Sequence, residues 1–446
     1  MKILKIIHGY PPLYTAGSEV YSQSICDELS KKHQVLVFTR EENPFKPDFT
    51  IRTLFCHHNL SITLVNMPRA KDGFRHRELD GRFQELVSEF SPDLAHIGHL
   101  NHLSTGIVDV LVAAGVPIVF TLHDFWLMCP RGQFLQRNFG EDQLHAICSG
   151  QDHAKCSRNC YKMFHSGYEV SLALNISYEI SHRIPKGKAA LADDRHWTDW
   201  IEARMDETRN LCEKVNRFIA PSIYLKNRFI NDFGIPADRI QYMDYGFPTH
   251  YLTPNQNKER SEQYRFGYIG THIPAKGVNL LIEAFASISD AAELYIWGTK
   301  DQQSTKALRQ MAAGMHNVHF MGNYVNSNLA NEVFSRVDCI VVPSIWGENS
   351  PLVIHEAQAC HIPVLTADFG GMSEYVHHMV NGVLFKHRDA KSLTEKMIWA
   401  TQNRKQMEQF GIRGYLYSAD GQVPGIVEHC KELEVIYNQI IEHNGK

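Results

Sequence analysis

The sequence predicts an α/β protein of two domains, each built on a doubly wound parallel sheet. Three observations support this fold class: a length of 446 residues, an alternation of short apolar runs with helical segments, and the return of that alternation in the second half. A chain of this length exceeds one ordinary hydrophobic core, and two domains of roughly 200 residues fit it best. Alternating strands and helices predict parallel sheets with helices on both faces.

The first half contains apolar runs of strand length separated by segments of helical periodicity. Strands are expected over 3–8, 35–39, 93–97, 117–122, 217–222 and 240–243, and helices over 19–31 and 78–90. Pro117 is compatible with the strand that it opens. The region that fits this alternation least well is about 129–206, and we expect it to be an insertion that ends in a helix near 197–212.

A polar stretch with two prolines, 247–263, predicts an interdomain linker. Beyond it, strands are expected over 265–269, 294–297, 318–321, 338–342 and 363–366, and helices over 278–287, 328–334 and 427–441. The last of these helices is amphipathic. The expected boundaries are therefore 1–248 for the first domain, 249–420 for the second and 421–446 for a C-terminal helix.

The composition restricts the class of protein. Apolar residues make up 43% and charged residues 21%, as in soluble globular domains. The formal net charge of −4 gives no electrostatic reason to expect a nucleic-acid partner. The first residues are too short for a signal-peptide core, and no apolar run reaches the length of about 18 residues that spans a bilayer. We therefore expect a cytoplasmic protein.

The most informative segment joins a predicted strand to a predicted helix and contains two glutamates, Glu348 and Glu356, with seven residues between them. Ser350 is expected to cap the helix and Pro351 to occupy its first position, with the helix running to Ala359. Such a helix start has free backbone N–H groups and can bind phosphate. One carboxylate can face the mouth of the helix while the other binds a more distant pair of hydroxyls, which suits a nucleotide diphosphate sugar.

Three further segments point to the same crevice. The strand at 363–366 ends in a loop with Gly370 and Gly371, next to the strand end that carries the glutamates, and ligands bind at such strand ends. Lys276 lies between a strand and a helix, where a cation is unfavourable unless an anion is bound. Gly17 follows the first strand and lets a helix start approach a phosphate, although the chain has no G-x-G-x-x-G fingerprint there.

The segment from Glu348 to Glu356 resembles the E-x7-E signature of the retaining glycosyltransferases of family 4, and the resemblance is strongest over 264–415. It implies the GT-B fold, in which two Rossmann-like domains face across a cleft and the last helix crosses back to the first domain. It also implies transfer of a hexose-type sugar from a nucleotide diphosphate sugar, without a catalytic metal. The acceptor would be a hydroxyl of a glycan, a lipid-linked sugar or a small molecule, as in polysaccharide biosynthesis. A lipid-linked acceptor would require peripheral contact with the inner face of the membrane.

The resemblance assigns roles to individual residues. Glu348 would lie near the donor sugar, Glu356 would bind the ribose hydroxyls, and His123, which ends the strand at 117–122, would contact the sugar. The catalytic set is expected to be Glu348, Lys276 and His123. The expected donor-binding residues are Gly17, Lys276, Glu348, Asn349, Ser350, Leu352, Val353, Glu356 and Gly371. Asn323 and Tyr324 are expected to flank the base, and His96 and His99 to face the acceptor.

One position departs from the family pattern. The family commonly has an arginine directly after Gly270, and this chain has Thr271, so one expected diphosphate cation is absent or replaced. Thr271 points to one alternative, a non-catalytic partner subunit with a degenerate donor site. A GT-B sugar-nucleotide epimerase also stays open, because the helix-start phosphate site would serve it as well. A uridine diphosphate sugar is favoured as the donor because such donors are common, and guanine is not excluded.

A cluster of four cysteines has no role in the proposed sugar transfer. Cys129, Cys148, Cys156 and Cys160 fall within the predicted insertion, and the C-x3-C spacing of the last two suits tetrahedral zinc. Reduced thiols or disulfides are the alternatives. The sequence thus leaves open a structural zinc site, with no catalytic metal expected.

Overall fold

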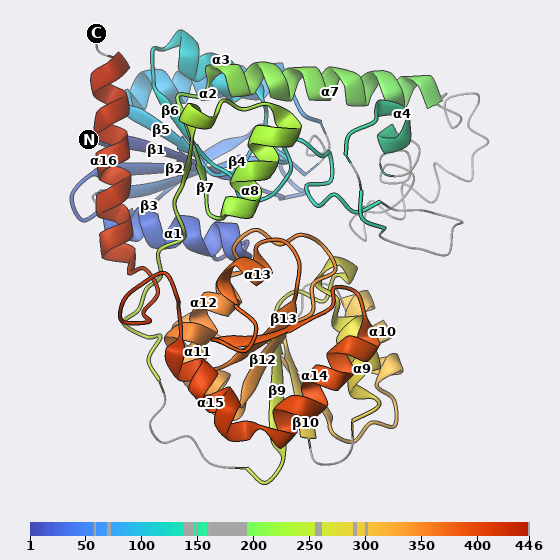
Figure 1. Ribbon diagram of the computed structural model, residues 1–446. Coiled ribbons are helices and arrows are strands. Elements are labelled where there is room, and N and C mark those ends of the chain that lie inside the picture. The colour runs from blue at the N-terminus through green and yellow to red at the C-terminus, as the bar shows by residue number, and fades with distance from the viewer. Residues whose placement is uncertain are drawn as a thin grey trace. The chain divides into compact units, whose positions relative to one another are not determined.

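The computed structural model describes residues 1–57, 59–68, 73–136, 146–148, 150–157, 160, 194–254, 261–288, 292–298 and 302–444. The chain divides into two compact units, one of Met1–His123 with Val215–Lys446 and one of Asp124–Lys214. The larger unit contains two sheets, and the sequence-derived fold class of parallel α/β sheets is confirmed (Figure 1).

The first sheet has eight strands in the order β3-β4-β2-β1-β5-β6-β7-β8, and all neighbours are parallel except β3 and β4. Its strands are β1 (Lys2–Ile6), β2 (Gln34–Glu41), β3 (Ile51–His57), β4 (Leu60–Asn66), β5 (Leu94–Ile97), β6 (Ile118–Thr121), β7 (Arg217–Ala220) and β8 (Ile240–Tyr242). The central strands are buried on both faces and are mainly apolar, with Lys5 of β1 and His96 of β5 as buried polar exceptions.

The helices of this half are α1 (Gly17–Leu29), α2 (Arg77–Phe90), α3 (Gly106–Ala113) and α8 (Ile223–Arg228). In α2, Leu79, Phe83 and Val87 recur every four residues and are the buried positions of the helix. This spacing puts one apolar stripe on the protein core and leaves the charged residues to solvent.

The second sheet has six parallel strands in the order β11-β10-β9-β12-β13-β14. They are β9 (Tyr264–Ile269), β10 (Ala292–Trp297), β11 (Val318–Gly322), β12 (Cys339–Val342), β13 (Val364–Ala367) and β14 (Gly382–Phe385). The helices that accompany them are α9 (Val278–Phe285), α10 (Gln302–Met311), α11 (Leu329–Glu332), α12 (Leu352–Ala359), α13 (Met372–Tyr375), α14 (Ala390–Gln402) and α15 (Arg404–Arg413).

The last helix, α16 (Ile426–Asn444), returns to the first sheet, as expected. It packs against α1 (Figure 1). The hydroxyl of Tyr437 lies 2.6 Å from Nδ1 of His96, and Nε2 of His429 lies 2.8 Å from the hydroxyl of Tyr21. His96 is fully buried and also bonds Thr121, so it anchors α16 in the core; the expectation that it faces an acceptor was wrong.

The smaller unit, Asp124–Lys214, corresponds in part to the region that fitted the strand–helix alternation poorly. Its described elements are α4 (His153–Cys156), α7 (Asp194–Lys214) and an antiparallel bridge between Leu135 and Ile147. The helix expected near 197–212 is therefore present and longer than predicted.

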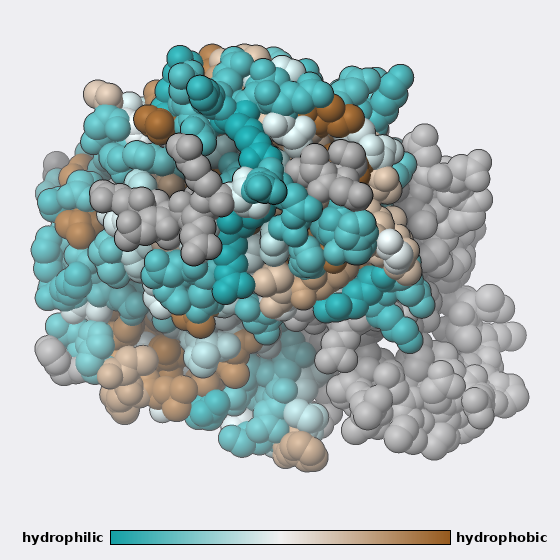
Figure 2. All heavy atoms as spheres, turned by 90° about the horizontal axis from the view of Figure 1, so that it is seen from below, coloured by the Kyte–Doolittle hydropathy of each residue, from teal (hydrophilic) through white to brown (hydrophobic). Residues whose placement is uncertain are grey.

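No described helix has the combination of length and apolar character needed to cross a bilayer. Figure 2 shows one face of the molecule, on which hydrophilic side chains predominate and hydrophobic ones form smaller groups.

Candidate functional site

The ends of two neighbouring strands in the second sheet define the candidate site. β9 and β12 pair directly, although β10 and β11 lie between them in the sequence and extend the sheet on the far side of β9. This change of direction is a topological switch point, where open α/β sheets bind ligands. The loop after β9 contains Lys276, and the loop after β12 contains Glu348.

Lys276 and Glu348 form an ion pair, with Nζ of Lys276 2.7 Å from Oε1 of Glu348. The same carboxylate oxygen accepts hydrogen bonds from the Ser344 hydroxyl at 2.5 Å and from the indole N–H of Trp346 at 2.9 Å. The glutamate side chain is buried, whereas the lysine side chain retains 30% of its exposure. The site therefore holds a partly accessible cation on a rigid, buried carboxylate.

The helix that follows, α12, starts at Leu352, one residue later than predicted. Pro351 occupies the capping position, and no side chain caps the helix. The prediction that Ser350 is the cap was wrong, because its hydroxyl donates to Oδ1 of Asp244 at 2.9 Å instead. The N–H groups of Leu352 and Val353 belong to the first turn and have no acceptor within the helix, so they can bind an anion.

Two glycines after β13 allow the neighbouring loop to approach closely. A Cβ atom on Gly371 would lie 1.4 Å from the carbonyl oxygen of Asn349, so no other residue fits without backbone movement. The Gly371 N–H donates to the carbonyl of Glu348 at 2.8 Å. Gly370 has a φ of +64° and would bring a Cβ to 2.9 Å from Cα of Gly347. The loop after β13, which was expected to lie at the same crevice, therefore packs closely against the loop that carries Glu348.

Glu356, in the second turn of α12, is half-buried, and burial raises its pKa to about 7. Two tyrosines interact electrostatically with its carboxylate. Burial is the main cause that raises the pKa of Tyr251 to about 12, and the charge of Glu356 adds to it. The pKa of Tyr324 is raised for the same two reasons. Glu356 thus lies close to Tyr324, one of the residues expected to flank the base, and to Tyr251, which sequence reasoning missed.

The first sheet supplies the opposite side of this region. α1 starts at Gly17, and a Cβ on Gly17 would lie 3.4 Å from Cδ1 of Leu352. The starts of α1 and α12 therefore meet, each with unpaired backbone N–H groups that can face a phosphate.

His123 follows β6 and is fixed by one hydrogen bond, with Nδ1 2.6 Å from the Tyr245 hydroxyl. Its Nε2 is buried and has no hydrogen-bond partner among the described residues. Burial, followed by the charges of Lys5 and His99, lowers the pKa of His123 well below its usual value. The ring is therefore neutral and has one ring nitrogen available for another ligand.

Asn349 connects the two halves of the larger unit. Its Oδ1 accepts from the Ser222 hydroxyl at 2.7 Å, and its Nδ2 lies 3.3 Å from the carbonyl of Leu122 and 3.4 Å from that of His123. The side chain is thus occupied in holding the glutamate loop against the ends of β6 and β7.

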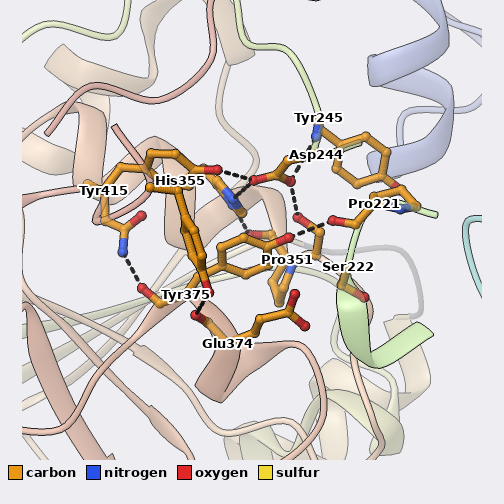
Figure 3. A network of polar contacts seen from close by, with 12 residues as sticks. Pro221, Ser222, Asp244, Tyr245, Pro351, His355, Glu374, Tyr375 and Tyr415 are labelled. Atoms are coloured by element: carbon orange, nitrogen blue, oxygen red, sulfur yellow. Dashed lines mark hydrogen bonds and ion pairs between the residues drawn. The ribbon is translucent and has the colours of Figure 1, made fainter. Parts of the chain in front are cut away.

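A buried aspartate, Asp244, extends this connection beside the start of α12 (Figure 3). Its Oδ2 accepts from Nε2 of His355 at 2.9 Å and from the hydroxyl of Tyr415 at 2.8 Å. Burial disfavours the charged form, but the charge and hydrogen bonds of His355 and the bond from Tyr415 hold the pKa of Asp244 below its usual value. The other ring nitrogen of His355 lies 3.2 Å from the carbonyl oxygen of Pro351, so the ring links Asp244 to the residue that precedes α12.

We expect Tyr415→Phe to lower the free energy of unfolding by about 2 kcal/mol, because it removes a hydrogen bond to a buried carboxylate. The shift in urea midpoint measures this change. Tyr417→Phe is the matched control, since that hydroxyl bonds a carbonyl of Glu374 from a side chain that is 48% exposed, and it should cost less than about 0.5 kcal/mol. Equal decreases in the free energy of unfolding for the two variants would contradict the conclusion that the hydrogen bond from Tyr415 to Asp244 stabilises the fold.

Sequence reasoning found Lys276, Glu348, Glu356 and the glycines of this region, and the structure brings them to one edge of the second sheet. It missed Asp244 and Tyr245, although both directly follow the strand predicted at 240–243. A search for polar residues at every strand end finds them. His272, next to the Thr271 that stands in place of the family's arginine, is buried, and its Nδ1 lies 2.9 Å from the hydroxyl of Thr305.

Two family descriptions match the chain. Residues 15–156 match the description Glycosyltransferase Family 4, and residues 252–417 match Glycosyl transferases group 1. These two ranges include Gly17, His123, Lys276 and both glutamates.

The curated relatives are distant. An uncharacterised glycosyltransferase of Methanocaldococcus jannaschii is 25% identical over 44% of this chain and 52% of its own length. A D-inositol 3-phosphate glycosyltransferase of Geodermatophilus obscurus is 26% identical over 47% of this chain and 51% of its own. The chain thus spans about half the length of these curated relatives.

Solved structures match over the whole chain. The Anabaena protein HepE, in complex with UDP and glucose, is 17% identical and has a TM-score of 0.67, with 98% of this chain and 99% of HepE covered. Sequence identity at this level establishes the fold alone, and the predicted arrangement of two sheets with a returning C-terminal helix is confirmed.

Proposed function

This chain belongs to glycosyltransferase family 4 and has the GT-B fold, and from that premise we propose that it transfers a sugar from a nucleotide diphosphate sugar to an acceptor hydroxyl. The proposed reaction retains the anomeric configuration. The observation that carries the proposal is the convergence of Lys276, Glu348 and the uncapped start of α12 at the switch point of the second sheet.

The proposed chemistry depends on the leaving diphosphate. Its negative charge grows as the glycosidic bond to phosphate breaks and the sugar acquires oxocarbenium character. A fixed cation and backbone donors directed at that charge lower the barrier. In this proposal Lys276 supplies the cation, the N–H groups of Leu352 and Val353 supply the donors, and Glu348 orients Lys276 beside the sugar.

The remaining groups would position the donor and the acceptor. Glu356 would accept hydrogen bonds from the two ribose hydroxyls, with Tyr324 near the base. The neutral His123 offers Nε2 to a sugar hydroxyl from the first sheet. No side chain is assigned as the base for the acceptor; the leaving phosphate itself would take the acceptor proton.

The donor is proposed to be a uridine diphosphate sugar. HepE, whose fold this chain shares, has been solved with UDP and glucose. The acceptor is proposed as a hydroxyl of a glycan, a lipid-linked sugar or a small molecule, and a lipid-linked acceptor would bring the protein to the membrane surface.

A donor panel tests the proposal. Uridine, guanosine, adenosine and cytidine diphosphate sugars would be compared by the thermal shift that each produces in the whole chain. Consumption of the effective donor would then be followed with and without glycan and lipid acceptors. We expect one base to raise the melting temperature, and its donor to be consumed only with an acceptor, giving a retained anomeric product.

Other outcomes have distinct meanings. Isomerisation of the donor sugar without an acceptor would support the epimerase. Binding without turnover on any acceptor, or no binding at all, would favour the non-catalytic subunit that Thr271 suggests.

A further inference from the structure

A cavity lined by four cysteines lies within the unit Asp124–Lys214. Cys129, Cys148, Cys156 and Cys160 all contribute to its wall. The cavity volume is about 20 Å³, which is room for a single water molecule or ion. Four cysteines therefore line a space of single-ion size.

Backbone hydrogen bonds fix the first two cysteines. The N–H of Cys129 donates to the carbonyl of Phe125 at 2.7 Å, inside a tight turn. The N–H of Cys148 donates to the carbonyl of Phe134 at 2.7 Å, beside the bridge between Leu135 and Ile147. Cys148 therefore lies next to a short antiparallel pairing, and Cys129 lies in a turn that precedes the first segment of that pairing.

The other two cysteines lie four positions apart in the sequence. Cys156 ends α4, and its N–H donates to the carbonyl of Asp152 at 2.7 Å. Asp152 also caps α4 by accepting from the N–H of Lys155 at 2.8 Å. Cys160 lies beyond the end of α4 and lines the same cavity as Cys156.

The walls offer few ligands other than sulfur. Met128 and Phe134 are apolar and buried. Arg131 and Gln151 also reach the cavity, but the guanidinium donates to the carbonyl of Leu135 at 3.0 Å and the amide of Gln151 donates to that of Met128. The chemistry of the cavity is therefore that of a soft, thiol-rich site.

We propose that these four cysteines bind one structural Zn²⁺ ion. Zinc takes four thiolates tetrahedrally at Zn–S distances of about 2.3 Å, and a shell closed by four protein ligands leaves no position for catalysis. Binding releases four thiol protons to solvent and needs no oxidant or reductant. Within the part of the chain that the structure describes, no group of three or more candidate ligands has metal-site geometry, so binding of the ion would require the cysteine side chains to change position.

Disulfides explain the arrangement less well. The thiol of Cys156 interacts electrostatically with each of the other three. A single disulfide would use only one of these three partners. A tetrahedral ion uses all four at once.

The proposed ion would organise part of this unit. The unit begins directly after His123 in the chain, and the ion would join positions from 129 to 160. Small folding units often need such a metal because their hydrophobic cores are small. The inference is independent of the donor chemistry, since it concerns a different unit and a different ligand.

Metal analysis of the purified whole chain tests the proposal. We expect about one zinc per chain by inductively coupled plasma mass spectrometry, released when a mercurial reagent blocks the thiols. Cys156→Ser should lower the zinc content at least several-fold, whereas Cys56→Ser, an exposed cysteine in β3, should leave it unchanged.

Cobalt substitution keeps the test decisive if Cys156→Ser does not fold. Co²⁺ in the wild-type chain should give the intense ligand-field and sulfur charge-transfer bands of a tetrahedral thiolate site. A folded, zinc-free protein without those bands, or an intact mass showing disulfides among the four cysteines, would overturn the proposal.

Discussion

Replacing Lys276 with methionine should reduce kcat by about 100- to 1,000-fold, the usual cost of removing one group that stabilises transition-state charge. Methionine preserves the length and apolar stem of lysine and removes only the ammonium. Its expected effect is large because Nζ is the cation placed at the strand-end loop, 2.7 Å from Glu348, and Thr271 stands where a second cation is usual. Steady-state kinetics with the preferred donor measure the change.

The division between kcat and KM identifies the role of the lysine. A group that acts mainly on the leaving diphosphate lowers kcat more than it raises KM. Lys431→Met, on α16 at a side chain that is 59% exposed, is the charge-matched control and should leave both constants unchanged. A Lys276→Met enzyme with wild-type kcat would remove the lysine from the mechanism.

Glu356→Ala should weaken donor binding by about 100-fold. A carboxylate that accepts from two ribose hydroxyls makes two charge-assisted hydrogen bonds, together worth about 3 kcal/mol. Calorimetry with the preferred nucleotide measures the loss. Glu395→Ala, at an exposed position of α14, removes the same group far from the strand ends and should leave affinity unchanged.

The raised pKa of Glu356 adds a pH dependence to this prediction. The pKa rises from 4.5 to about 7 on folding because of burial. The folded chain therefore binds this proton more tightly than the unfolded chain, and stability falls as pH rises from about 4.5 to 7. Glu356→Gln should accordingly stabilise the ligand-free protein at pH 8, by at most about 3 kcal/mol, and have little effect near pH 5.

Donor binding should follow the opposite trend. The ionised carboxylate is the better acceptor for ribose hydroxyls, so wild-type affinity should fall between pH 8 and pH 6. Glu356→Gln should bind weakly and without this dependence. A wild-type affinity that is flat across this range, with no loss in the alanine variant, would place the nucleotide elsewhere.

Elements that are marked by a pattern of neighbouring residues could be predicted from the sequence. β12 is a continuous apolar run, and its following loop and helix were predicted to within one residue. The sequence analysis missed β3, β4 and β14, and the misses of β3 and β14 have physical reasons. β3 is largely exposed, with Phe55 at 85%, and so lacks a burial pattern, while β14 has four residues and begins with glycine.

The sequence predicted only those residues of the candidate site whose relative positions follow from their spacing along the chain. Glu348 and Glu356 lie on one strand–loop–helix unit, so their relation follows from the chain itself. Asp244 lies more than a hundred positions from its partners Ser350 and His355, and only the fold brings them together. Ser350 was predicted to cap the helix because serine is a common N-cap residue, but its hydroxyl donates to the buried carboxylate of Asp244 instead.

A crystal structure with uridine diphosphate bound would show whether the start of α12 is the phosphate site. We expect phosphate oxygens about 3 Å from the N–H groups of Leu352 and Val353 and from Nζ of Lys276, with the ribose hydroxyls on Glu356. A diphosphate bound away from the start of α12, with Glu356 in contact only with water, would contradict this expectation.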